Sequence, residues 1–268
     1  MKYAALLSET PPGLARFKLA FPEQRSWRVF HQEHRGAYDE LISALEERQR
    51  GICAFCEISL YTDTPTPARQ VEHWRPKSLD ISTSTNFTFD AYNFHAACLG
   101  GSAIYHQPPF RIGVNTPEAN LSCGQKKENF DPEGCHPKPY RPSELPIDAI
   151  LVSYSIDGTV SSSMNAAESG YDPLRIEATI SYLGLNCERL VQARKEIMAY
   201  LDSRFFEHYQ AAEPADEDEK TSYALAEVAK EMAWWDEEPL PRFVTMLRSY
   251  VGIANDNYLL TSSSWAAG

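Results

Sequence analysis

The feature that most constrains the fold of this chain is a pair of cysteines, Cys53 and Cys56, separated by two residues. Two thiolates at this spacing can bind one tetrahedral zinc ion, and a structural zinc ion contributes folding free energy directly. A redox pair with the same spacing belongs in a thioredoxin-like βαβ setting, of which the flanking sequence gives no sign. We therefore predict a structural Zn²⁺ site, with two unrelated core cysteines as the alternative.

Four further cysteines are candidates for the remaining zinc ligands. Cys98 and Cys123 are the natural second pair, although 24 residues lie between them. Cys135 and the adjacent His136 are close enough in the sequence to compete, so the fourth ligand stays open. Cys187 falls in a region of helical periodicity and is expected to be a small buried apolar residue.

The composition is that of a folded soluble protein, with 43% apolar and 23% charged residues in a chain of 268. The apolar run at the N-terminus stops at Ser8, which is too short for a signal peptide or a membrane span. We expect a cytoplasmic protein with no membrane segment, in which the cysteines stay reduced. The net charge of −12 excludes a surface that binds phosphate backbones over its whole area.

Hydrophobic periodicity predicts an α+β protein that is mainly helical. An amphipathic helix is expected over residues 34–50, a short strand over 70–74 and a β-hairpin over 149–160. Residues 94–141 are rich in Pro, Gly, Asn and His and are expected to form loops and one short helix around the metal. Later helices are marked by four groups of apolar residues: Ile176, Ile180 and Leu183; Leu190, Ala193, Ile197, Leu201 and Phe205; Ala224, Leu225, Val228, Ala229, Met232 and Trp235; and Phe243, Val244, Leu247 and Val251.

These elements suggest three regions. Residues 1–50 would be an N-terminal helical segment, residues 51–140 a metal-bound module, and residues 141–268 a hairpin followed by helices. The acidic stretch 211–220 is expected to be a solvated connector, and the tail after Asn255 is expected to fray.

A carboxylate and an imidazole stand side by side at Glu72 and His73, with 15 residues between them and the first cysteine pair. Hydrolysis of a phosphodiester needs a base that deprotonates water and a divalent cation that stabilises the developing charge. A neutral histidine and an acidic ligand meet these two needs. An isolated Glu-His pair is more often a surface feature, so its significance depends on the residues around it.

Those neighbouring residues follow a recognisable order. The C-x-x-C pair is followed by Glu-His-x-x-Pro-Lys at residues 72–77, by Asn93 five residues before Cys98, and by Cys-Gly-Gln-Lys-Lys at residues 123–127. This order resembles the HNH endonucleases, which carry a zinc-stabilised ββα-metal core. The resemblance implies such a core here, with flanking helices.

A narrower resemblance rests on two longer segments. Residues 51–57 read Gly-Ile-Cys-Ala-Phe-Cys-Glu, and residues 71–78 read Val-Glu-His-Trp-Arg-Pro-Lys-Ser. Both are similar to the nuclease family (PtuB) of Septu anti-phage systems and its retron-associated relatives, and so are residues 178–180 and 185–186. The similarity is strongest over residues 38–127.

The resemblance implies a role for each residue of the site. His73 would be the general base, Glu72 would bind a catalytic Mg²⁺ or Mn²⁺, and Asn93 would brace the hairpin. Gln125 departs from the family, which commonly has an Asn or His there as a cation ligand, although its amide oxygen is also able to bind one. Three histidines remain open as replacements for it: His95, His106 and His136. Four basic residues are candidate phosphate contacts: Arg75, Lys77, Lys126 and Lys127.

The resemblance also implies partners. Septu nucleases work with an ABC-type ATPase subunit (PtuA-like), and this sequence has no G-x-x-x-x-G-K-[ST] loop of its own. We expect a hetero-oligomer that cuts DNA, in which the C-terminal helices dock the partner.

Two other functions compete with the nuclease. The first is an inactive, zinc-stabilised adaptor, which the acidic charge and the departure at Gln125 favour. The second is a redox protein that uses Cys53 and Cys56, which is disfavoured because no neighbouring cation or helix N-terminus is evident to lower a thiol pKa.

Overall fold

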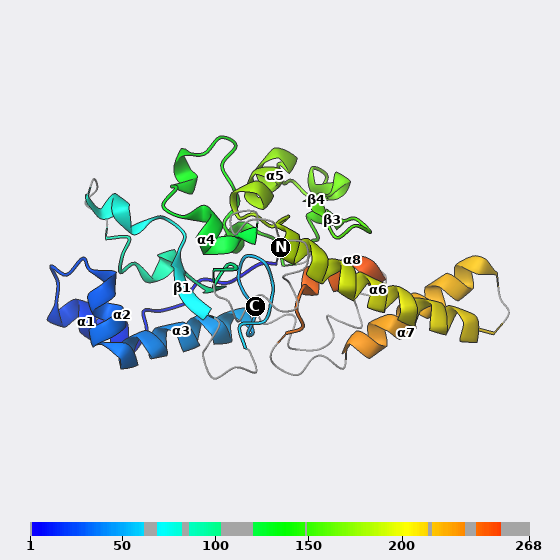
Figure 1. Cartoon of the computed structure of the whole chain (residues 1–268), viewed down its shortest axis with the longest axis horizontal. Helices are drawn as coiled ribbons and strands as arrows, with labels where there is room; N and C mark the ends of the chain where they lie inside the picture. The colour runs from blue at the N-terminus through cyan, green and yellow to red at the C-terminus, as the bar shows by residue number, and fades with distance from the viewer. Residues whose placement is uncertain are drawn as a thin grey trace.

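The computed structural model of the chain describes residues 2–61, 69–81, 86–102, 120–147, 149–213, 216–233 and 240–252. The protein is mixed α and β with a large helical share, as the sequence predicts. It is elongated: α1 and α2 lie at one end, α6 and α7 extend to the other, and β1 and α4 lie between them (Figure 1).

Three helices form the N-terminal end: α1 (Pro12–Ala20), α2 (Trp27–Glu33) and α3 (Arg35–Gln49). The helix expected over residues 34–50 is confirmed as α3, with Tyr38, Leu41, Ile42 and Leu45 buried on one face. It ends at Arg50 and Gly51, whose φ angles of 60° and 75° are left-handed, a common way to end a helix. The chain then enters the Cys53–Cys56 turn.

The centre of the molecule is an antiparallel hairpin of β1 (Arg69–His73) and β2 (Phe94–Cys98), with the short helix α4 (Cys123–Lys127) beside it. The expectation of loops at residues 94–98 was wrong, because this segment is a strand. All five of its residues are buried. A strand buried on both faces has no alternation of polar and apolar residues, so periodicity does not reveal it.

The predicted second hairpin is confirmed as β3 (Val152–Tyr154) and β4 (Val160–Ser162). Its turn contains Gly158, whose φ of 84° suits a glycine. The helix α5 (Pro173–Tyr182) follows, with the Asp172 side chain accepting a hydrogen bond from the Leu174 amide at its start. α5 packs against β4.

The C-terminal region contains α6 (Glu188–Ala211), α7 (Glu217–Ala233) and α8 (Val244–Val251). The predicted connector over 211–220 was too long, because α6 reaches Ala211 and α7 already begins at Glu217. Acidic residues at 217–219 occupy the first turn of α7, where negative charge stabilises a helix. Trp235 and the tail after Asn255 lie outside the described residues.

One cluster of buried apolar residues extends along the described chain from Ala4 to Val251. It includes residues of all three predicted regions, and their boundaries at 50 and 140 stay a prediction. Of the helices that the structure describes, none combines the length and the apolar character that crossing a membrane requires.

Candidate functional site

Four buried cysteines converge between the first cysteine turn, β2 and α4. The sulfur atoms of Cys53, Cys56, Cys98 and Cys123 all lie within 4.8 Å of one another. Neighbouring sulfurs are 3.7 to 3.8 Å apart, which matches the edge of about 3.8 Å in a tetrahedron with Zn–S bonds of about 2.3 Å. The donor set and its geometry therefore fit a structural zinc ion.

The electrostatics of the cluster also favour a cation. Burial raises the pKa of the Cys56 and Cys123 thiols well above their ordinary value, because a thiolate loses its hydration there. Without a cation, these two thiols therefore keep their protons. A zinc ion would replace the protons and stabilise the thiolates.

The other candidate ligands lie elsewhere. Cys135 donates a weak hydrogen bond to the Asp131 carbonyl, and the neighbouring His136 is exposed. Cys187 is buried at the N-terminal end of α6. None of the three belongs to the four-sulfur cluster.

Glu72 and His73 are adjacent on β1 and therefore point to opposite faces of the hairpin. Glu72 faces α4, where its carboxylate is 2.9 Å from the ammonium of Lys127. The Lys127 side chain is only 1% exposed and that of Glu72 15%, so the pair is largely shielded from water. This ion pair was not predicted from the sequence, in which Lys127 was a candidate phosphate contact.

His73 lies on the other face among aromatic rings. Its ring is 4.5 Å from that of Trp27 on α2 and 4.9 Å from that of Phe94, centre to centre. Nε2 is 3.0 Å from the Thr88 carbonyl oxygen, and Nδ1 has no hydrogen-bond partner among the described residues. Burial lowers the pKa of His73 well below its ordinary value, so the imidazole is neutral at pH 7.

Asn93 joins the two ends of the loop between β1 and β2. Its Oδ1 accepts a hydrogen bond from the Arg75 amide at 2.8 Å. Its Nδ2 donates to the carbonyls of Arg75 and Phe87, both at 2.9 Å. These three bonds fix the backbone that follows His73.

Gln125 and Glu72 are not joined by any contact that the described structure shows. The Gln125 side chain packs against Gly100, whereas the α4 residues that lie against Glu72 are Gly124 and Lys127. A Cβ atom at Gly124 would collide with the Glu72 carboxylate. Consecutive helical residues point about 100° apart, so the side chain of Gln125 leaves α4 in a different direction from the face that Gly124 presents.

Among the three alternative histidines, His95 lies opposite Glu72 in the β1–β2 register. It is buried, and its Nε2 accepts a hydrogen bond from Arg141 at 3.2 Å. His106 lies outside the described residues. Within the described part of the chain, no second group of three His, Cys, Asp or Glu ligand atoms converges. Among the described residues, Glu72 therefore belongs to no group of three such donors, and its carboxylate is already paired with Lys127.

The four predicted phosphate contacts differ in whether their side chains are already paired with a carboxylate or are exposed to solvent. Arg75 is held by Asp131 through two hydrogen bonds of 3.1 and 2.8 Å and lies over the Phe87 ring. Lys127 is committed to Glu72. Lys77 and Lys126 are exposed, which leaves them accessible to a substrate.

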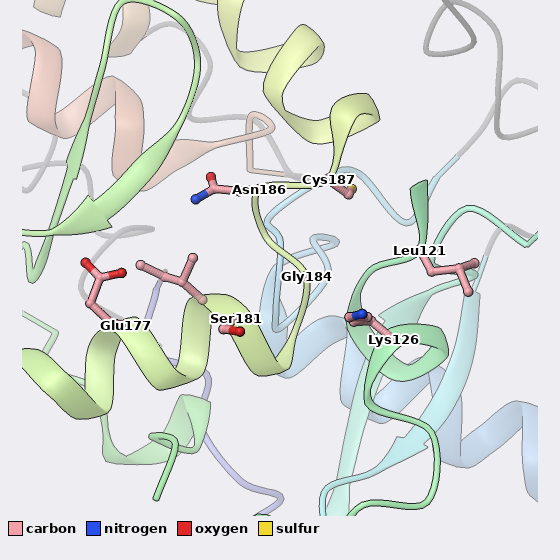
Figure 2. A pocket seen from close by; sticks show the side chains of 8 residues that line it. Leu121, Lys126, Glu177, Ser181, Gly184, Asn186 and Cys187 are labelled. Atoms are coloured by element: carbon pink, nitrogen blue, oxygen red, sulfur yellow. The ribbon is translucent and has the colours of Figure 1, made fainter. Parts of the chain in front are cut away.

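Lys126 lines a pocket of about 410 Å³ between α4, α5 and the segment that leads to α6. Figure 2 shows Lys126 on one side of the pocket and Glu177 of α5 on the other. The Asn186 side-chain amide accepts a hydrogen bond from the Val160 backbone N–H and donates one to the Val160 carbonyl. This pocket lies beside α4 and is separate from the buried faces that carry Glu72 and His73.

No family model matches the chain. A comparison with characterised proteins nevertheless supports a relationship with the HNH endonucleases. The relative that carries this name is an Escherichia coli protein of retron Ec83, whose assignment as an HNH endonuclease is itself provisional. The two sequences are 27% identical over 209 residues, which cover 71% of this chain and 76% of the relative.

Proposed function

We propose that this chain is an HNH endonuclease that hydrolyses DNA phosphodiester bonds. The observation that carries the proposal is the β1–β2 hairpin with α4 beside it, next to a buried four-cysteine cluster and with Glu72 and His73 on β1. The similarity to a retron HNH endonuclease supports the same reaction class.

His73 has the properties of a general base, but its ring must first become accessible to water and substrate. If Nε2 carries the proton and donates it to the Thr88 carbonyl, Nδ1 keeps a free lone pair with which to take a proton from water. Because burial keeps the imidazole neutral, it is in the form that a base requires. Trp27 covers this ring, so the active state requires α2 to move or a substrate to displace it.

Glu72 and Lys127 are the charged residues of the proposed site. A bound Mg²⁺ or Mn²⁺ would stabilise the negative charge that develops on the phosphate. If the carboxylate of Glu72 binds this cation, the cation takes its remaining ligands from water and the substrate phosphate. In the arrangement observed, the ammonium of Lys127 neutralises Glu72 instead.

We further propose an anti-phage role in complex with an ABC-type ATPase. The net charge of −12 supports a partner that supplies most of the affinity for DNA, and so does the pairing of Arg75 with Asp131 and of Lys127 with Glu72. The exposed aromatic residues of the α6–α7 region are candidate contacts for the partner: Tyr200, Phe206 and Tyr223.

A second candidate function is a zinc-stabilised adaptor without hydrolytic activity. The enclosure of His73 and the pairing of Glu72 with Lys127 favour it, since both groups are already occupied by the protein itself. The adaptor would keep its cellular role after His73→Ala, whereas the nuclease would lose it.

The proposal is tested by incubating the zinc-loaded chain with plasmid and linear DNA, with and without the candidate ATPase, in Mg²⁺ or Mn²⁺. Glu72→Gln is compared with Glu128→Gln, which changes an exposed carboxylate next to α4. We expect the wild type and Glu128→Gln to cut and Glu72→Gln to lose cutting. Equal cutting by the two variants would remove Glu72 from the mechanism.

A further inference from the structure

A buried zinc–tetrathiolate centre carries an excess of charge. Four thiolates and one Zn²⁺ sum to a net charge of −2, and all four cysteines here are buried. Burying an uncompensated charge is strongly unfavourable. A counter-charge near the sulfurs is therefore needed, and the described structure contains a candidate on α6.

Arg189 in the first turn of α6 is buried, with 2% of its surface exposed. Its Nη2 donates to the Ser122 hydroxyl at 2.5 Å, and its backbone amide donates to the Asn120 side chain at 3.0 Å. Its Nε lies against Gly101. The guanidinium is thus inserted between the segment after Cys98 and the residue before Cys123.

The partners of this guanidinium do not account for its charge. Within the described residues, no carboxylate forms an ion pair with Arg189, and its Nε has no hydrogen-bond partner. Burial lowers the pKa of Arg189, but the nearby cysteines Cys98, Cys187, Cys56 and Cys123 outweigh this effect and leave the pKa raised. Three of these four cysteines belong to the cluster, and the guanidinium lies beside Ser122 and Gly101, so it is placed to balance the thiolates that a bound zinc ion would hold.

We propose that Arg189 is the counter-charge of the zinc–thiolate centre, and that this contact couples zinc binding to the docking of α6. Zinc binding would fix the thiolates, and the thiolates would stabilise the buried guanidinium at the start of α6. The helix that extends toward the far end of the molecule (Figure 1) would then be anchored through the metal centre.

Variants of the full zinc-loaded chain distinguish the effect of the Arg189 charge from the effect of its hydrogen bond to Ser122. Arg189→Met removes the charge, Arg189→Lys keeps a charge, and Ser122→Ala removes the hydrogen bond but keeps the guanidinium. Arg194→Met is the matched control, because Arg194 is also buried on α6 but donates to the carbonyls of Gly158 and Leu185. The measurements are the zinc affinity and the rate of zinc release to a coloured chelator.

We expect Arg189→Met to weaken zinc binding by about 10- to 100-fold, the range observed when a partner outside the ligand set is removed. Arg189→Lys, Ser122→Ala and Arg194→Met should change it by about threefold or less. Wild-type zinc affinity in Arg189→Met would overturn the proposal. An equal loss in Ser122→Ala would also overturn it, because bracing would then explain the effect.

A measurement on the wild type covers the case in which Arg189→Met does not fold. Zinc is removed with a chelator, and backbone hydrogen exchange is followed in α6 and α7. We expect protection to fall first in residues 188–191 and to persist at the α6–α7 contact. Unchanged protection in residues 188–191 after complete zinc removal would show that α6 docks independently of the metal.

Discussion

At the scale of single residues, the Glu72 carboxylate of the proposed site is neutralised by the ammonium of Lys127. The lysine is almost fully buried, which a solvated phosphate contact would not be. Its position follows from α4, which begins at the cluster residue Cys123 and on which Gly124 and Lys127, three apart, share the face that lies against Glu72. The zinc site thus places a positive charge beside the carboxylate.

Lys127→Met should therefore destabilise the fold. Removing one partner of a buried ion pair leaves an uncompensated charge, at a cost on the order of 3 kcal/mol. Adding Glu72→Gln to Lys127→Met should restore part of this loss. Urea unfolding of the zinc-loaded variants measures both effects, with Lys126→Met as the exposed control, which should change stability by about 0.5 kcal/mol or less. Strictly additive effects of the two substitutions would contradict a direct pair.

His73 gives a prediction about pH. An unburied histidine takes up its proton near pH 6.5, whereas burial lowers the pKa of His73 in the folded protein well below that. The unfolded chain then binds more protons than the folded one below about pH 6.5. The contribution of the neutral His73 to stability is present above this pH and is lost as the pH falls.

The histidine ring signals in NMR test this directly. The His73 signal, assigned with His73→Gln, should not titrate between pH 8 and about pH 6. Trp27→Ala opens one aromatic wall of the site, so it should raise the midpoint toward the ordinary value. A wild-type midpoint near pH 6.5 would mean that His73 is open to water, contrary to the observed burial.

At the scale of the elements, the sequence predicts those with a clear period. The helix α3 and the β3–β4 hairpin follow from amphipathic spacing and an Asp-Gly turn. The strand β2 does not, because burial on both faces removes the alternation. The short helix α4 was expected only as one helix within residues 94–141, and its position and the residues that face Glu72 were not predicted. The contacts of Trp27 and Arg189 depend on tertiary packing that no local pattern encodes.

The cysteine turn and α8 are joined by a contact between distant parts of the sequence. The buried carboxylate of Glu57 accepts a hydrogen bond from the Thr245 amide at 2.8 Å and one from its hydroxyl at 2.7 Å. Thr245 lies in the first turn of α8, where a carboxylate is favoured by the helix dipole. Glu57 thus connects the helix to the zinc-binding segment.

Thr245→Val keeps the shape of the side chain and removes the hydroxyl donor. We expect a loss of about 1–3 kcal/mol, because a buried charged acceptor loses one of its partners. Thr221→Val on α7 is the matched control, since its hydroxyl bonds to a carbonyl of the same helix at an exposed position. Thermal unfolding of the two variants makes the comparison, and equal shifts would argue against a special role for Glu57.

At the scale of the whole molecule, the metal cluster connects segments that are far apart in the sequence. The four cysteines come from the turn after α3, from the end of β2 and from the start of α4. All four also belong to the apolar core of the described residues. Loss of zinc should therefore affect more than the local turn.

Removal of zinc by a chelator should lower the thermal midpoint by more than 10 °C and broaden the transition. The reason is that zinc binding supplies folding free energy that four protonated thiols do not replace. Calorimetry of the zinc-loaded and stripped chains provides the measurement, and restored zinc should recover the original midpoint. A stripped chain that unfolds at the same temperature would contradict a structural metal.

The most direct test of the account is DNA cleavage by the zinc-loaded chain with its candidate ATPase, in Mg²⁺ or Mn²⁺, comparing His73→Ala with the exposed control His136→Ala. We expect the wild type and His136→Ala to cut at similar rates. His73→Ala should lose at least about 100-fold, the lower end of what a general base contributes, with zinc content unchanged. Cutting by His73→Ala at the wild-type rate, or no cutting by a zinc-loaded wild-type complex, would contradict the nuclease and leave the adaptor.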